Sequence, residues 1–465
     1  VRLESRIQVL LKSGSKNLAW ILLERTRIQW ENSMSPLNDP VITDTAFMID
    51  TSSIKYGPGV TGEVGYEMAR LGARKVLIVT DSNIVTTNAV QLARESLASE
   101  NIEITTYDRV RVEPTDESFK DAIAFAAEGD FDGYVAIGGG STIDTAKAAN
   151  LYATYPADFL TYVNAPIGKG LPVPGPLKPL IAIPTTGGTG SETTGVAIFD
   201  LLDMKAKTGI AHRSLRPVMG LVDPDNAGTM PKMVQACSGL DVLCHGLESY
   251  TAIPFHTREA PENPGLRPSY QGSNPISDVW STRAIEMCTQ NIVSSVHNSD
   301  DYESRSQMML AATFAGVGFG NAGCHLPHGM SYPVAGMVEN NFVEGYPEGK
   351  PIVPHGMSVI LNAPAVFRFT APMNPERHLQ AARLMGADVE NANPEDAGDI
   401  LADAIIDLIR QIDIPNGLSE VGYSESDAEA LAKGALPQHR VIKLSPRPVD
   451  EKDLTQLFID SMTLW

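Results

Sequence analysis

The stretch GYVAIGGGSTIDTAKAA (residues 133–149) decides the fold. An apolar run over residues 133–137 predicts a buried strand, and a helix is expected over the second half of the stretch. Glycine lets a backbone approach a pyrophosphate closely, and the first N–H groups of a helix attract phosphate. The GxGxxG fingerprint is absent, so the loop alone does not distinguish a nucleotide site from a plain tight turn. The loop between strand and helix consists of Gly138, Gly139, Gly140 and Ser141.

The same alternation of strand and helix continues on both sides of this stretch. Strands are predicted at residues 54–59, 76–79, 102–107, 180–183, 196–199 and 221–222, and helices at 61–71 and 118–128. Such alternation predicts a mostly parallel sheet. Long helical patterns dominate the rest, at 233–250, 278–296, 302–316, 378–385, 395–412, 424–433 and 452–462, and a proline-rich surface loop at 254–275 interrupts them.

We therefore predict an α/β, Rossmann-like parallel-sheet domain followed by an all-α domain. A chain of 465 residues is long for one hydrophobic core, which also favours two domains. The predicted division is an extension at residues 1–43, a nucleotide-binding α/β domain at 44–225, and a helical metal-binding domain at 226–465.

Composition limits the classes of partner. The net charge of −20 argues against binding to nucleic acid and to anionic membranes. The sequence contains no run of about 18 apolar residues, so no membrane span is predicted. None of the four cysteines, at positions 237, 244, 288 and 324, forms a CxxC pair, so reduced thiols are expected. The sequence leaves a homo-oligomer open.

The start of the chain bears on location. It mixes basic and apolar residues in the manner of an amphipathic targeting segment, but Glu4, Glu24 and Glu31 argue against a transit peptide, which is poor in acids. We expect a cytoplasmic protein, and the basic start keeps the mitochondrial matrix as the alternative.

Two further segments favour a dinucleotide. Asp81 follows the strand at 76–79, where a carboxylate can accept hydrogen bonds from ribose hydroxyls and would repel a 2′-phosphate, favouring NAD over NADP. Alternatively, Asp81 caps a helix that starts near Asn83. A second loop rich in glycine and hydroxyl groups, TTGGTGSE (residues 185–192), opens with Thr185 and Thr186 after another apolar strand and offers donors to the same cofactor.

A metal site is predicted in the helical half. Asp241 and His245 stand four residues apart in a predicted helix and so leave one face about a turn apart. His328 and His355 are each followed by glycine, whose small size leaves room for an ion. Three imidazoles and a carboxylate suit Fe(II) or Zn(II), with an open position for a substrate oxygen. His325 is either a rival ligand or a cleft histidine. The histidines expected at the surface are His212, His256, His297, His378 and His439.

At these motifs the sequence resembles a known family. GGGSTIDTAK, PTTGGTGSE, DVLCHGLES, HGMSYP and VPHG, in this order, resemble the iron-containing (group III) alcohol dehydrogenases over about residues 46–465. The stretches VRVEPTD, NAPIGKG, SYQGSNPISD, FAGVGFGNAG and PAVFRFTAPMNPERH are similar to one branch of that family, which transfers hydride between hydroxyacids and oxoacids.

The resemblance implies roles for individual residues. It implies Fe²⁺ as the metal, with Zn²⁺ as the alternative, and NAD(H) as a tightly held cofactor. The implied metal ligands are Asp241, His245, His328 and His355. The implied cofactor contacts are Asp81, Gly138, Gly139, Gly140, Ser141, Thr185, Thr186 and Lys207.

The catalytic residues are less clearly indicated by the resemblance. Tyr332 stands where the family has a histidine near the nicotinamide, which leaves a proton-relay role at this position open. The interval from His328 to His355 is longer than is usual in the family and suggests an inserted loop over the cleft. Lys169, in the sequence IGKG, is the predicted receptor for substrate carboxylates, and an exposed loop lysine is the alternative. The predicted catalytic residues are thus His325, Tyr332 and Lys169.

The expected reaction follows from this branch. Its implied substrates are 4-hydroxybutyrate and 2-oxoglutarate, which become succinate semialdehyde and 2-hydroxyglutarate while NADH stays bound. The metal would act as a Lewis acid on the substrate oxygen. The nearest alternative is an NAD-dependent alcohol dehydrogenase that releases NADH. A lyase of the dehydroquinate synthase type would need clustered basic residues, which are few in the helical half, and a nucleotide sensor would not need metal ligands.

Overall fold

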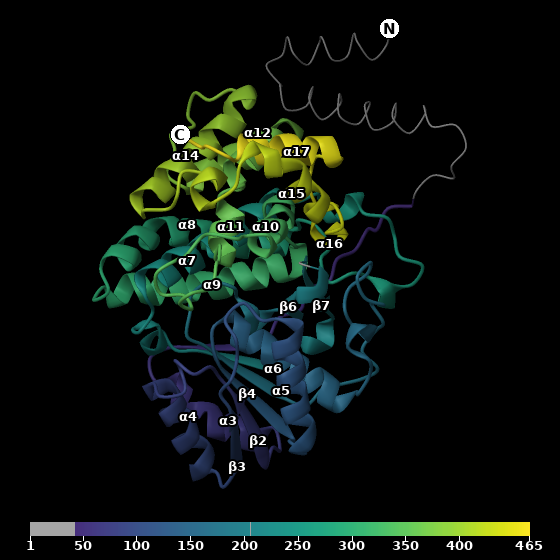
Figure 1. Cartoon of the computed structure of the whole chain (residues 1–465), viewed down its shortest axis with the longest axis vertical. Coiled ribbons are helices and arrows are strands. Elements are labelled where there is room, and N and C mark those ends of the chain that lie inside the picture. The colour runs from purple at the N-terminus through teal and green to yellow at the C-terminus, as the bar shows by residue number, and fades with distance from the viewer. Residues whose placement is uncertain (1–41, 205) are drawn as a thin grey trace. The chain divides into compact units, whose positions relative to one another are not determined.

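A six-stranded parallel sheet forms the N-terminal half of the protein (Figure 1). The computed structural model describes residues 42–204 and 206–465, so the predicted extension at 1–43 lies almost entirely outside them. The strand order is β1-β8-β5-β4-β2-β3, and every neighbouring pair is parallel. The strands are β1 (Ser53–Tyr56), β2 (Lys75–Val79), β3 (Glu103–Tyr107), β4 (Gly133–Gly138), β5 (Leu180–Pro184) and β8 (Met219–Val222).

Helices cover both faces of this sheet, which explains why its central strands are apolar throughout. Alternate side chains of β4 point into two different cores. Val135 and Ile137 pack in the core that contains residues of α3 and α4. Tyr134 and Ala136 pack in the core that contains residues of α5 and α6. The predicted parallel sheet is therefore confirmed. The helices are α3 (Val64–Arg70), α4 (Asn88–Ser99), α5 (Asp116–Glu128) and α6 (Gly140–Thr154).

Two strands lie outside the main sheet. The segment predicted as a strand at 196–199 is β6 (Val196–Leu201), which pairs antiparallel with β7 (Ala206–Ala211). The sequence analysis did not anticipate β7. This ladder contacts both α6 and α10 (Leu326–Gly336), so it joins the N-terminal α/β half to the helical half.

The C-terminal half is helical, as predicted, and encloses one large apolar core. Helices α7 (Lys232–Thr251), α8 (Pro275–His297) and α9 (Tyr302–Ala322) pack on one another between the sheet and the later helices (Figure 1). Four short helices were not predicted: α10, α11 (His355–Ile360), α12 (Ala363–Thr370) and α16 (His439–Ile442). The others are α13 (Pro375–Leu384), α14 (Ala397–Gln411), α15 (Ala428–Ala435) and α17 (Glu451–Asp460).

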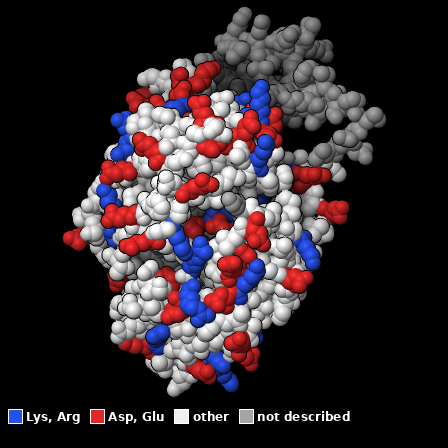
Figure 2. All heavy atoms as spheres, in the orientation of Figure 1, with Lys and Arg blue, Asp and Glu red and all other residues white. Residues whose placement is uncertain are grey.

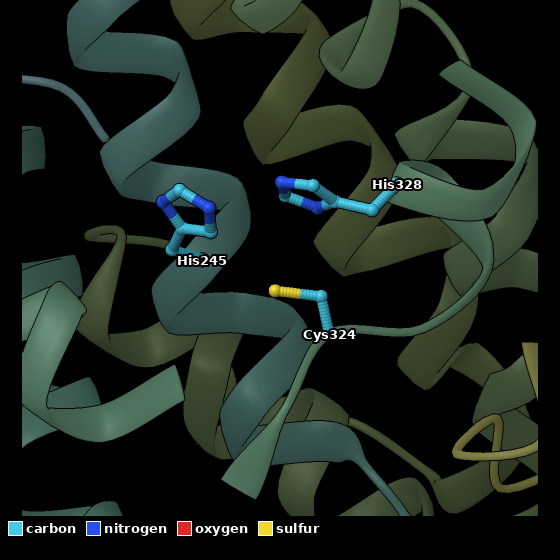
Figure 3. A group of neighbouring side chains, drawn as sticks. All are labelled: His245, Cys324 and His328. Atoms are coloured by element: carbon cyan, nitrogen blue, oxygen red, sulfur yellow. The ribbon is translucent and has the colours of Figure 1, made fainter. Parts of the chain in front are cut away.

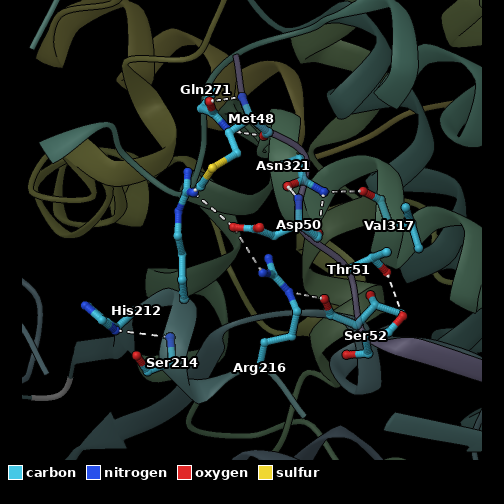
Figure 4. A network of polar contacts seen from close by, with 12 residues as sticks. Met48, Asp50, Thr51, Ser52, His212, Ser214, Arg216, Gln271, Val317 and Asn321 are labelled. Carbon is cyan, nitrogen blue, oxygen red and sulfur yellow. Dashed lines mark hydrogen bonds and ion pairs between the residues drawn. The ribbon is translucent and has the colours of Figure 1, made fainter. Parts of the chain in front are cut away.

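The segment before β1 ties the two halves together (Figure 4). Met48 and Gln271 exchange two hydrogen bonds of 2.9 and 2.7 Å, and Asp50 and Asn321 exchange two of 2.9 and 3.0 Å. The Asp50 carboxylate also pairs with Arg213 at 2.9 Å. These bonds fix the entry to the sheet against the end of α9.

Among the described residues, a small separate unit comprises residues 42–46 together with His256–Arg267. Within it, Thr43 forms an antiparallel bridge with Glu259, and Asp44 pairs with Arg267 at 2.8 Å and with Arg258. The bonds to Arg267 and Arg258 hold the pKa of Asp44 below its usual range although burial raises it. This unit accounts for part of the loop predicted at 254–275.

Acidic and basic side chains are interspersed over the face seen in Figure 2. Among the described residues, no helix has the length and apolar character needed to cross a bilayer.

Candidate active site

Three predicted cofactor segments lie at one edge of the sheet. Asp81, the glycine loop at 138–141 and Thr185 follow β2, β4 and β5, which are neighbours in the sheet. The register pairs Val79 with Ala136 and Gly138 with Pro184, so the three strands end at similar heights. Ligands of open parallel sheets bind at the carboxyl ends of the strands. The arrangement therefore suits a dinucleotide.

The glycines allow the two loops to touch each other. A Cβ on Gly140 would lie 2.5 Å from Thr189, and one on Gly139 would lie 3.1 Å from Thr186. Because Gly139 is the N-cap of α6, no side chain there bonds the first N–H groups of the helix, and these remain available to a phosphate.

Asp81 caps a backbone turn, which is close to the alternative role predicted for it from the sequence. Its Oδ1 accepts hydrogen bonds from the backbone N–H groups of Asn83 and Ile84 at 2.8 and 3.1 Å. The residues it caps form turns, and the next helix, α4, begins only at Asn88. The ribose contact of Asp81 remains a prediction.

Lys207 is a buried cation whose charge is matched within the protein. Its Nζ lies 2.5 Å from Glu113 and 3.2 Å from Asp200. Burial lowers the pKa of Lys207, but these two carboxylates outweigh it and raise the pKa above the ordinary value. Glu113 adopts φ = 53°, a left-handed conformation that is rare for a non-glycine residue. Lys207, Glu113 and Ser141 line one cavity with the predicted metal ligands.

Three of the predicted metal ligands face a carboxylate oxygen of the fourth, Asp241. Asp241 Oδ1 lies 3.6 Å from His245 Nε2, 3.4 Å from His328 Nε2 and 3.6 Å from His355 Nε2. Ligand atoms about 2.05 Å from a tetrahedral metal stand about 3.4 Å from one another, so these separations fit an ion among the four.

Unsatisfied polar atoms mark the same point. Asp241 Oδ1 and His328 Nε2 are buried and have no hydrogen-bond partner within the described part of the chain. Buried polar atoms almost always find partners, and a cation between these two would supply one. The residues present therefore fit a divalent metal.

Helix α7 presents a third polar residue on the ligand face. Glu248 follows Asp241 by seven residues, and its Oε1 lies 2.6 Å from His328 Nδ1. Its Oε2 accepts hydrogen bonds from the backbone N–H groups of His325 and His328 at 2.7 and 3.3 Å. Such a carboxylate fixes the ring orientation and raises the basicity of a metal-binding histidine. The sequence analysis missed Glu248, although its i+7 spacing was a usable signal.

Burial sets the protonation states of the cluster. It lowers the pKa of His245 to about 3 and lowers that of His355, which leaves both rings neutral, the form that binds metals. Burial raises the pKa of Asp241, but the imidazoles outweigh it and keep the carboxylate ionised. Burial opposes a proton on His328, but Glu248 and Asp241 favour one and raise the pKa of this ring above its ordinary value.

Cys324 forms a rival group with His245 and His328 (Figure 3). One potential ligand atom from each of the three lies within 4.8 Å of the other two. Burial raises the pKa of the Cys324 thiol to about 11, so the thiol is protonated at neutral pH and is a poor ligand in that form. The carboxylate of Asp241 is already charged, and we therefore favour the set built on Asp241.

The glycines that follow His328 and His355 allow close helix packing. This differs from the predicted role, which was to leave room for an ion. A Cβ on Gly356 would lie 1.8 Å from the carbonyl oxygen of Cys237 on α7, and one on Gly329 would lie 2.8 Å from Ile442. Their absence lets α11 and α10 approach their neighbours closely, which carries the histidines to Asp241.

The three predicted catalytic residues are not brought together. Tyr332 lines the cavity, whereas His325 and Lys169 do not. His325 is fully buried, with Nε2 2.9 Å from Thr251 Oγ1, and burial lowers its pKa to about 4. Lys169 is exposed in the loop after Asn164.

Two other residues differ from expectation. His378, expected at the surface, is fully buried, with its two ring nitrogens near Thr370 Oγ1 and the backbone oxygen of Asn374. Arg440, which the sequence analysis did not consider, lines the cavity and donates from Nη2 to the Tyr332 hydroxyl at 2.9 Å. No periodic pattern links Arg440 to the other site residues, so its place in the cavity could not be predicted from sequence.

Comparisons with known proteins agree with this geometry. Residues 51–224 match the iron-containing alcohol dehydrogenase family, and residues 269–462 match the C-terminal part of the same family. A solved structure of a 1,3-propanediol oxidoreductase is 26% identical and superimposes with a TM-score of 0.78, covering 90% of this chain and 100% of that one. An archaeal alcohol dehydrogenase from a Red Sea brine pool is 25% identical, with a TM-score of 0.78, over 90% of this chain and 99% of that one.

More similar relatives have a narrower name. The mitochondrial hydroxyacid-oxoacid transhydrogenase of Homo sapiens is 55% identical over 91% of each chain. The probable hydroxyacid-oxoacid transhydrogenase, mitochondrial, of Dictyostelium discoideum is also 55% identical, over 91% of this chain and 80% of that one.

These names contradict the expected cytoplasmic location, because the relatives that cover most of this chain are described as mitochondrial. The acidic residues near the start, which argued against a targeting segment, misled that expectation, and they lie outside the described part of the chain. The chain belongs to the iron-containing alcohol dehydrogenase family, among its hydroxyacid-oxoacid transhydrogenases.

Proposed function

We propose that this protein transfers hydride from 4-hydroxybutyrate to 2-oxoglutarate through an NAD that stays bound, giving succinate semialdehyde and 2-hydroxyglutarate. The proposal depends above all on one observation. A buried carboxylate oxygen, Asp241 Oδ1, faces three imidazole nitrogens in a cavity that Gly140 and Ser141 also line. A metal and a nicotinamide held at this cavity could act on one substrate carbon.

Each half of the chain would hold one of these groups. The segment at 44–225 would hold NAD through Asp81, the two loops and Lys207, and the segment at 226–465 would hold the metal. Fe²⁺ is the proposed ion and Zn²⁺ the alternative. A divalent metal held by Asp241, His245, His328 and His355 supplies a Lewis acid at the substrate oxygen. Stacking of Phe319 on His245, with centroids 3.8 Å apart, keeps that ring in place.

The chain's own residues must also manage a proton. Oxidation of the hydroxyacid releases one hydride and one proton, and reduction of the oxoacid consumes both. Of the residues predicted to act in catalysis, Tyr332 lines the cavity and can exchange a proton with a bound substrate, whereas His325 is enclosed beside Thr251. Lys169 remains the carboxylate receptor predicted from sequence.

The decisive experiment supplies purified protein with 4-hydroxybutyrate and 2-oxoglutarate and no added nucleotide. We expect succinate semialdehyde and 2-hydroxyglutarate to accumulate in equal amounts, measured by mass spectrometry. If product forms only with free NAD, and NADH accumulates without any oxoacid, the protein is instead an alcohol dehydrogenase that releases its cofactor.

We also propose a mitochondrial location for this protein, as the names of its relatives state for them. The basic residues near its start are compatible with a targeting segment. Cell fractionation of the tagged full-length protein should recover it with matrix markers, and recovery in the cytosolic fraction would contradict the proposal.

A further inference from the structure

Arg440 is a cation in the cavity without a matching anion. One guanidinium nitrogen donates to the Tyr332 hydroxyl, and the group lies 4.9 Å from the centre of the Tyr270 ring. Its other terminal nitrogen, Nη1, is buried and has no hydrogen-bond partner within residues 42–204 and 206–465. No aspartate or glutamate of that part of the chain pairs with it. A desolvated guanidinium with a free donor is costly unless a ligand completes it.

The other cations suit an anionic substrate less well. Lys207 also lines the cavity, but Glu113 and Asp200 already neutralise its ammonium group. Lys169 is exposed and does not line the cavity. Arginine also presents two parallel N–H donors to a carboxylate, which the point charge of a lysine cannot do.

Arg440 is tied to the helix that carries one of the metal ligands. Tyr332 follows His328 by four residues on α10, so the two side chains leave the same face about 6 Å apart along the helix axis. The bond from Arg440 to Tyr332 therefore links the guanidinium to the face of α10 that carries His328. The apolar side chains of Phe319 and Val441 line the same cavity.

The proposed substrates share a carboxylate at a matching position. In 4-hydroxybutyrate the reacting carbon is followed by two methylene groups and a carboxylate. In 2-oxoglutarate the reacting carbonyl carbon is also followed by two methylene groups and a carboxylate. The products, succinate semialdehyde and 2-hydroxyglutarate, keep this arrangement, so one fixed cation could bind all four compounds with the reacting carbon in the same place.

We propose that Arg440 binds the distal carboxylate of both substrates and both products, and that the Tyr332 hydroxyl positions its guanidinium. Arg440 thereby sets the length of acid that the site accepts. The inference deepens the proposed function and rests on it for the identity of the acids. In this arrangement the phenol oxygen of Tyr332 accepts the guanidinium N–H.

The test compares two aldehydes that differ only at the distal end. Succinate semialdehyde carries a carboxylate where butanal carries a methyl group. Protein loaded with NADH is mixed with each aldehyde, and oxidation of the bound NADH is followed by fluorescence in the wild type and in Arg440→Met. We expect Arg440→Met to lower kcat/KM for succinate semialdehyde by about a hundredfold and for butanal by less than about threefold. Equal losses for both aldehydes, or none for either, would overturn the proposal.

Three further variants make the comparison specific. Arg447→Met removes an exposed arginine from the same C-terminal segment, outside the cavity, and should change neither rate. Tyr332→Phe should lower kcat/KM for succinate semialdehyde about tenfold more than it lowers kcat/KM for butanal, because any loss of proton exchange affects both aldehydes. Lys169→Met should leave the preference for succinate semialdehyde intact, and a loss as large as that of Arg440→Met would assign the carboxylate to Lys169 instead.

A binding measurement separates this inference from the proposed reaction. Glutarate, which lacks an oxidisable or reducible group, should bind the wild type in a calorimetric titration and bind Arg440→Met at least about thirtyfold more weakly. If the wild type fails to transfer hydride from 4-hydroxybutyrate to 2-oxoglutarate but shows this difference, only the proposed function is wrong. If hydride transfer occurs and glutarate binds both proteins equally, only the role of Arg440 is wrong.

Discussion

Asp144 and Asp241 line the same cavity, yet the protein treats the two carboxylates in opposite ways. Asp144 is satisfied from within: Oδ1 accepts from Lys147 at 3.1 Å and from Ser191 at 2.5 Å, and Oδ2 accepts from the backbone N–H of Ile198 at 2.9 Å. Asp241 Oδ1 accepts no hydrogen bond within the described residues and faces three imidazole nitrogens instead.

The difference shows how to separate structural polar clusters from functional ones. Lys147 also donates to the backbone oxygen of Val196 at 2.7 Å, so the Asp144 cluster holds α6 against β6 without any ligand. A cluster that the chain completes by itself contributes to folding, whereas one that leaves a donor or acceptor unmatched indicates a missing ligand. Arg440 and Asp241 are of the second kind.

The largest effect is expected from Asp241→Asn. Loss of the charged ligand should reduce the bound metal to near zero and the transhydrogenase rate by at least about a thousandfold, since metal-ion catalysis contributes several kcal/mol. Metal content by plasma mass spectrometry, measured beside the rate, checks this. A variant that keeps one metal per chain would show that Asp241 is not a ligand.

The converse variant is Asp144→Asn. It removes the carboxylate that is paired with the buried ammonium of Lys147, so we expect the free energy of unfolding to fall by about 3–5 kcal/mol while the metal content stays unchanged. Urea denaturation gives the stability. Asp413→Asn, which disrupts an exposed pair with Lys232, is the matched control and should change stability little. Loss of metal from Asp144→Asn would remove the distinction between the two carboxylates.

His378 extends the comparison to a buried histidine whose two ring nitrogens both have hydrogen-bond partners within the protein. Burial lowers its pKa from 6.5 to about 4. Between these values the unfolded chain binds a proton that the folded chain does not, so stability falls as the pH drops through this window. The loss amounts to about 3 kcal/mol for this group. The free energy of unfolding of His378→Gln should therefore fall less than that of the wild type between neutral and acidic pH. An equal fall in both proteins would contradict this prediction.

The smallest effect is expected at Glu248, which contacts the ligand His328 and is not itself a predicted metal ligand. Glu248→Gln should weaken metal affinity about 10–100-fold, as is typical for partners of metal-binding histidines. Competition with a chelator measures this. An unchanged affinity would mean that the 2.6 Å contact with His328 Nδ1 serves folding alone.

The sheet and the long helices could be predicted from sequence because each has a recognisable pattern of apolar residues. The run at 133–137 is apolar at every position because both sheet faces are covered, and α14 repeats its apolar residues at helical spacing. The antiparallel strand β7 escaped prediction because its partner, β6, leaves the main sheet.

The site was predicted in part, for related reasons. The spacing of Asp241 and His245 signalled one helix face, and Glu248 continued the same pattern unnoticed. Helices α10 and α11 were missed because both are short and a proline stands at each start: Pro327 lies in the first turn of α10, and Pro354 directly precedes α11. Arg440 reaches the cavity only through the packing of α16 on α10, a long-range contact without a local signal.

The hydrogen bonds before β1 also determine how the protein can be shortened. Met48 and Asp50 bond to Gln271 and Asn321, and the Ser52 hydroxyl lies 2.6 Å from the backbone oxygen of Glu192. A recombinant form that begins at or before Phe47 keeps all of these partners. One that begins at the first strand would lose the bonds to Gln271 and Asn321, so a shortened form should begin at or before Met48 if these bonds are to be kept.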